Sequence, residues 1–92
     1  MTETQLLIGS LSNDLFRVAS LTQRGSTKAA LKFLQEAKRW SVPLQKQDVA
    51  EYIIKIAQDV SACNPNDDIS MADAERYLMN GVLLQNYVLH AH

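Results

Sequence analysis

Residues 70–89 read SMADAERYLMNGVLLQNYVL, and this stretch decides the expected architecture. Ser70 and Asp73 have the spacing of a helix N-terminal capping box, with the acid in the first turn, where the helix dipole favours it. One face carries Ala74, Tyr77, Leu78, Gly81, Leu84 and Val88, and a second stripe carries Met79, Leu83 and Tyr87. A helix that is apolar nearly all round is expected to be buried nearly all round. We therefore predict that this helix lies at the centre of the fold, or that it shares its second stripe with another chain.

The dipeptide Asn80-Gly81 is a turn signal inside this pattern. Glycine costs about 1 kcal/mol relative to alanine in a helix interior, so a kink or break at this point is the alternative to a continuous helix.

Three further helical patterns precede this one. Residues 2–23 begin with Thr2-x-x-Gln5, another capping-box form, and end before Gly25, which suits a left-handed helix cap. Residues 27–40 follow Ser26 as the N-cap and end because Pro43 disfavours helical geometry in the residue before it. In both segments the large apolar residues recur at helical spacing.

The third pattern covers residues 44–62 and starts between Pro43 and Asp48, with Asp48-x-x-Glu51 as a possible capping pair. Its apolar residues give the clearest amphipathic pattern in the chain: Val49, Tyr52, Ile53, Ile56, Ala57 and Val60. The sequence therefore predicts an all-α fold, a compact four-helix bundle with helices at about 2–23, 27–40, 44–62 and 70–89. Its 92 residues predict a single domain spanning 1–92.

Composition places the chain among ordinary globular proteins, with 47% hydrophobic and 21% charged residues. Cys63 is the only cysteine, so no internal disulfide can form, and a reducing compartment is expected. The N-terminus is acidic and polar, unlike a signal peptide, and no apolar run approaches about 18 residues. We expect a cytoplasmic protein with no membrane contact.

Charge is divided unevenly along the chain. Residues 1–46 hold seven basic and three acidic side chains, whereas residues 47–92 hold two basic and seven acidic ones. The two halves either neutralise each other within the fold or face an electrostatic partner. The basic residues of the second helical pattern and its surroundings form the candidate anion-binding or partner-binding set: Arg24, Lys28, Lys32, Lys38 and Arg39. The net charge of −1 argues against nucleic acid. Contact with an acidic protein surface is the alternative to a solvated helix face, which is the simpler interpretation.

The segment 64–75 resembles a degenerate EF-hand calcium loop. Potential oxygen ligands occupy loop positions one, three, five, seven and twelve: Asn64, Asn66, Asp68, Ser70 and Glu75. Ile69 stands where an EF-hand needs glycine, and a plain turn followed by a helix N-cap explains the same residues. The two histidines, His90 and His92, are poorly spaced to converge on one metal. We predict no metal site and no cofactor.

No set of residues in the sequence offers a nucleophile with its base, a phosphate loop or paired carboxylates, so we predict that the chain is not an enzyme. Trp40 is expected to anchor the core or a hinge through a partnered indole, with an interface hot spot as the alternative. The expected function is a non-catalytic interaction or regulatory module that forms a homodimer. Met79, Leu83 and Tyr87 would make its self-complementary patch. Anion binding by the basic residues and calcium binding at 64–75 are the alternatives.

Overall fold

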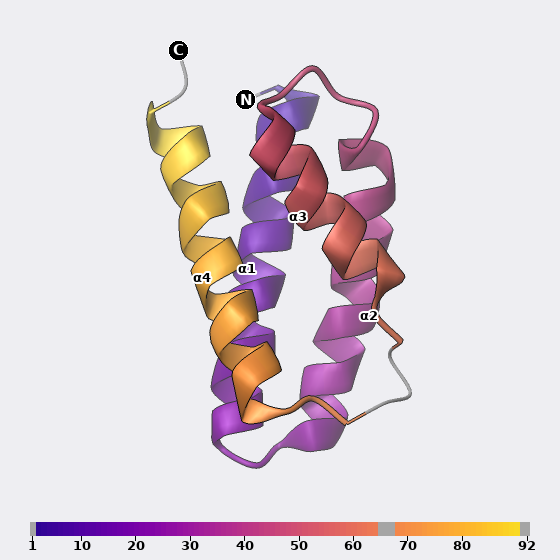
Figure 1. Ribbon diagram of the computed structural model, residues 1–92, viewed down its shortest axis with the longest axis vertical. Helices are drawn as coiled ribbons and strands as arrows, with labels where there is room; N and C mark the ends of the chain where they lie inside the picture. The colour runs from indigo at the N-terminus through magenta and orange to yellow at the C-terminus, as the bar shows by residue number, and fades with distance from the viewer. Residues whose placement is uncertain (1, 65–67, 91–92) are drawn as a thin grey trace.

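The computed structural model describes residues 2–64 and 68–90, which form four helices and contain no strand (Figure 1). The helices are α1 (Glu3–Gln23), α2 (Thr27–Leu44), α3 (Glu51–Ala62) and α4 (Met71–His90). Successive helices run in opposite directions, and the predicted all-α four-helix bundle is confirmed.

The centre of the bundle is α1, not α4. Helix α1 packs against both α2 and α4, and α3 packs against α2. Eight residues of α1 are buried, whereas α4 buries only Ala74, Tyr77, Gly81 and Leu84 and lies at one edge of the bundle (Figure 1). The prediction of a central fourth helix is therefore wrong. The number of apolar residues suggests that α4 is the most buried helix, because such a count leaves out the buried polar residues of α1.

The ends of α1 follow the predicted signals. The Gln5 backbone N–H donates to Thr2 Oγ1 over 3.1 Å, and the Thr2 N–H donates to Gln5 Oε1 over 3.0 Å, so both halves of the capping box form. After the helix, Gly25 adopts a φ of 79°, a left-handed conformation that glycine reaches without strain from a Cβ atom. This turn reverses the chain and sets α2 against α1.

Helix α2 continues four residues beyond the predicted end at Trp40 and includes Pro43. Proline removes one backbone hydrogen bond to the preceding turn and crowds the carbonyl four residues before it, so Pro43 opposes helix at this point. The last turn is held by burial, because Ser41 and Leu44 are completely inaccessible to solvent. Tertiary packing thus overrides the proline signal at Val42.

Helix α3 begins later than predicted, at Glu51 rather than near residue 44. Residues 45–50 form turns and a short extended connection, and the N-cap is Ala50, which provides no side-chain hydrogen bond. The predicted Asp48 and Glu51 capping pair is therefore not the start of the helix. The longer α2 uses residues up to Leu44, so the reversal occupies the positions assigned to the first turn of α3.

Helix α4 is continuous through Asn80-Gly81. The Ser12 hydroxyl of α1 donates to the Gly81 carbonyl over 2.8 Å. A Cβ atom at Gly81 would lie 3.0 Å from Cε1 of Phe16, so glycine is needed here for close approach of α1. At its start, the Asp73 N–H donates to Ser70 Oγ over 3.0 Å, which confirms Ser70 as the cap.

Candidate functional site

The solvent side of α4 is the most apolar exposed surface of the described residues. We call it the outer face of α4, and it consists of Met71, Leu78, Met79, Val82, Leu83 and Leu89. Their exposed fractions run from 38% for Leu83 to 64% for Leu89, well above those of core residues. Because this helix buries only one narrow stripe against α1, the rest of its apolar surface meets solvent. Exposed apolar patches of this kind mark interaction sites on soluble proteins.

The three residues of the predicted dimer patch do not lie on one surface of the structure. Met79 is 60% and Leu83 is 38% exposed, and both belong to the outer face. Tyr87 is half-buried and points to α3, where its ring meets Tyr52 edge-on with the centroids 6.0 Å apart. Its hydroxyl oxygen accepts a hydrogen bond from the Ala50 N–H over 3.4 Å. Tyr87 therefore makes contacts within its own chain and does not belong to the outer face of α4.

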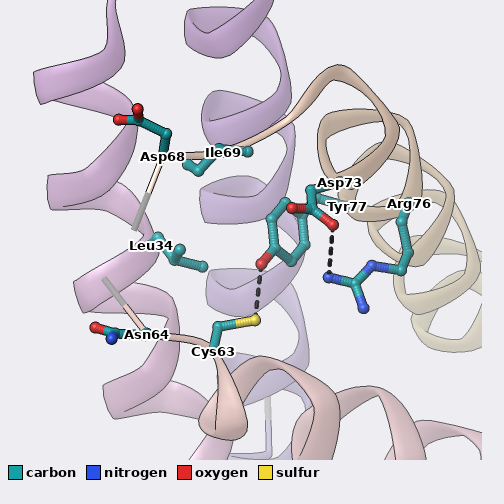
Figure 2. A pocket seen from close by; sticks show the side chains of 8 residues that line it. All are labelled: Leu34, Cys63, Asn64, Asp68, Ile69, Asp73, Arg76 and Tyr77. Carbon is teal, nitrogen blue, oxygen red and sulfur yellow. Dashed lines mark hydrogen bonds and ion pairs between the residues drawn. The ribbon is translucent and has the colours of Figure 1, made fainter. Parts of the chain in front are cut away.

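A small hollow lies where α3 ends and α4 begins (Figure 2). It has a volume of about 180 Å³, and Cys63 Sγ and Tyr77 Oη are 2.7 Å apart on its wall. Burial, followed by the hydrogen bond with Cys63, raises the pKa of Tyr77 above its usual value, so the phenol is no base at neutral pH. Arg76 donates to Asp59 over 2.9 Å and to Asp73 over 3.4 Å at the rim. The bond to Asp59 joins α4 to α3, the bond to Asp73 lies within α4, and neither activates a nucleophile.

Of the proposed calcium ligands, Asn66 lies outside the described residues. His92, one of the two histidines, also lies outside them. Ser70 Oγ is used in capping α4. Within 2–64 and 68–90, no group of three or more His, Cys, Asp or Glu residues is placed to hold a metal ion.

Four of the five predicted basic residues are exposed, and the fifth is not. Arg24, Lys28, Lys32 and Arg39 are exposed, the last three along the solvent side of α2. Lys38 is half-buried, and its Nζ donates to the Cys63 carbonyl over 2.5 Å at the end of α3. Lys38 thus satisfies a helix C-terminal carbonyl and belongs to the α2–α3 contact rather than to the basic face.

Ion pairs between the two halves do not neutralise the charge asymmetry of the described chain. The four ion pairs among the described residues are Arg17–Asp14, Lys55–Glu51, Arg76–Asp59 and Arg76–Asp73. Each joins two residues of the same half of the chain. Asp59 is half-buried in its pair with Arg76.

Sequence reasoning missed a buried carboxylate, that of Asp14, between α1 and α2. Asp14 is 3% exposed, and its Oδ2 atom has no hydrogen-bond partner among the described residues. Burial, and then the charge of Glu36, raises the pKa of Asp14 to about 6, although a hydrogen bond with Trp40 and the charge of Arg17 act to lower it. The available signal was its position, three residues after Leu11 and four before Val18, on the apolar face of α1.

Helices long and apolar enough to span a membrane are lacking in the part of the chain that the structure describes. Comparisons of the whole chain with protein-family models, with curated proteins and with solved structures found no match.

Proposed function

We propose that this chain is a non-catalytic interaction module that self-associates through the outer face of α4. The observation that carries the proposal is the exposure of six large apolar side chains along one helix. Removal of apolar surface from water is the dominant favourable term in most protein–protein association. A homodimer of two-fold symmetry covers the same face on both copies with one contact. A cytoplasmic location is part of the proposal, since the thiol of Cys63 is free.

The double variant Val82→Asp/Leu83→Asp is expected to be monomeric. It places a charge on both sides of the outer face, where burial of an unpaired carboxylate opposes association. Two copies of the variant each lose the apolar burial of two side chains, and we expect the dissociation constant to rise more than about a hundredfold. Light scattering after gel filtration measures the mass, and circular dichroism checks that helix content is retained.

The matched control is Val42→Asp. Val42 is 53% exposed on α2, which does not adjoin the outer face, and the variant should keep the mass of the wild type. A wild type that remains monomeric at high concentration, or a double variant that remains dimeric, would refute self-association through α4.

A second candidate function is contact between an acidic protein surface and the basic face of α2. It is favoured by the exposure of Arg24, Lys28, Lys32 and Arg39, which take no part in the ion pairs among the described residues. Contacts between exposed charges weaken as salt rises, whereas an apolar contact does not. Measuring mass or binding at low and moderate salt separates the two candidates.

A further inference from the structure

Six exposed positions of α4 form a regular stripe down one side of the helix. We call it the 71–89 stripe, and it consists of Met71, Glu75, Leu78, Val82, Gln85 and Leu89. Their spacing alternates between four and three residues, the alternation that lets two helices stay in contact along their length. At about 100° per residue, all six fall within about 80° of the helix circumference. Four of the six are large apolar residues exposed by 39% or more.

This stripe lies clear of the other helices of its own chain. Gly81 faces Phe16 of α1, and Arg76 and Tyr87 face α3. The centre of the stripe lies about 150° around the helix from the α3-facing residues and about 80° from Gly81. Helix α4 forms one edge of the bundle (Figure 1), and all six residues of the stripe are exposed.

The stripe is richer in large apolar side chains than the set suggested by sequence. Tyr87 is turned toward α3, so only Met79 and Leu83 of that set remain on the outer face. Met79 and Leu83 lie on the same side of α4 as Arg76, and Arg76 is paired with Asp59 of α3. The 71–89 stripe contains one charged residue, Glu75, and depletion of charge is typical of the core of an interface.

The order of residues along the stripe determines how two copies fit. Met71 and Leu89 lie nine residues on either side of Asn80, Glu75 and Gln85 lie five, and Leu78 and Val82 lie two. In an antiparallel pair centred at this level, Met71 meets Leu89 of the second copy and Leu78 meets its Val82. Glu75 meets Gln85, whose amide can donate to the carboxylate. In a parallel pair, Glu75 would meet the same carboxylate of the second copy, and two like charges would be desolvated together.

We propose that two copies of this chain pair their α4 helices antiparallel across the 71–89 stripe, with Glu75 of each opposite Gln85 of the other. This inference rests on the proposed self-association and adds the register and direction of the contact. Twenty residues of α4 give a contact about 30 Å long. A contact built mainly from one helix is at the small end of stable interfaces, so we expect a dimer that dissociates at accessible concentrations.

The test is a pair of opposite charges at position 85, Gln85→Lys and Gln85→Glu, measured as dimer dissociation constants by sedimentation equilibrium. Gln85 is exposed, so neither change disturbs the core. In the antiparallel pair, Gln85→Lys places an ammonium group opposite Glu75 twice per dimer and should lower the dissociation constant about tenfold. Gln85→Glu places a second carboxylate opposite Glu75 and should raise the dissociation constant about tenfold. The double variant Glu75→Lys/Gln85→Glu restores opposite charges and should bind as tightly as Gln85→Lys.

The possible results distinguish the antiparallel pairing from self-association through the outer face of α4. A wild type that is monomeric at every concentration refutes both. If both single variants weaken a dimer by similar factors, identical residues meet and the antiparallel direction is wrong. If neither variant changes the dissociation constant, the stripe is not the contact, and self-association through the remaining outer face still stands. The single variants Val82→Asp and Leu83→Asp give a second readout, since the proposal requires only Val82→Asp to abolish the dimer.

Discussion

The variant Asp14→Asn is expected to be more stable than the wild type at pH 8 by about 2 kcal/mol, which corresponds to a melting temperature about 10 °C higher. The carboxylate of Asp14 is 3% exposed, and its pKa in the folded chain is about 6 rather than 3.8. Because the folded pKa is the higher one, the folded state is favoured when the group is protonated. The advantage is complete below about pH 4 and is lost as the pH rises through about 6.

The size of this effect follows from the pKa difference. A difference of about two units corresponds to about 3 kcal/mol between the protonated and ionised forms, and the buried amide of asparagine gives back part of the gain. The groups that face Asp14 are Glu36 and Trp40 of α2 and Arg17 of α1. Removing the ionisable group leaves these neighbours in place.

The measurement is urea or thermal unfolding of Asp14→Asn and the wild type at about pH 4 and about pH 8, on either side of the folded pKa. We expect the difference in unfolding free energy between them to grow with pH, because only the wild type must ionise a buried acid. Asp48→Asn is the matched control, since it makes the same replacement at an exposed side chain and leaves Asp14 in place. A stability difference that is equal at the two pH values would show that Asp14 does not titrate between them.

The variant Gly81→Leu is expected to destabilise the fold by about 3 kcal/mol. A Cβ atom at this position lies 3.0 Å from Cε1 and 3.1 Å from Cδ1 of Phe16, and the rest of a leucine side chain extends further into α1. Relief requires α4 to move away from α1, which also stretches the bond from Ser12 Oγ to the Gly81 carbonyl. Overpacking of a buried contact costs about 1–3 kcal/mol, and the strained hydrogen bond adds to it.

Gly9→Leu is the control for helix propensity. Gly9 is also inside a helix, but a Cβ atom there meets nothing within 4 Å, so this variant should be at least as stable as the wild type. Chemical denaturation of both variants measures the contrast. Equal stabilities would mean that Phe16 moves aside freely and that close approach does not explain the glycine.

Much of the fold is predictable because the local signals agree with the packing. The capping box of Thr2 and Gln5 and the glycine at 25 determine the start of α1 and the turn after it whatever surrounds them. The end of α2 is not predictable, since Leu44 becomes buried only when the other helices are in place and its burial holds Pro43 inside the helix. The position of α4 is missed for a similar reason, because burial of polar residues in α1 depends on partners in other helices.

The candidate surface is predictable only in outline. Periodicity identifies α4 as too apolar for a single packed face, and six exposed side chains agree with that reasoning. Periodicity does not determine which side of α4 packs against α1 and which side faces α3. The half-polar character of Tyr87 suggests a dimer patch, and that same character lets it contact both Tyr52 and the Ala50 backbone within its own chain.

The pairing of α1 with α4 also determines how the molecule responds to mechanical force. The two helices are antiparallel neighbours, and the start of α1 and the end of α4 lie at the same end of the bundle (Figure 1). Tension applied through the two ends therefore pulls the helices apart from that end, as in the opening of a zipper, so the contacts break one after another rather than all at once. The load therefore reaches the contact between Ser12 and Gly81 before it reaches the Gly25 turn.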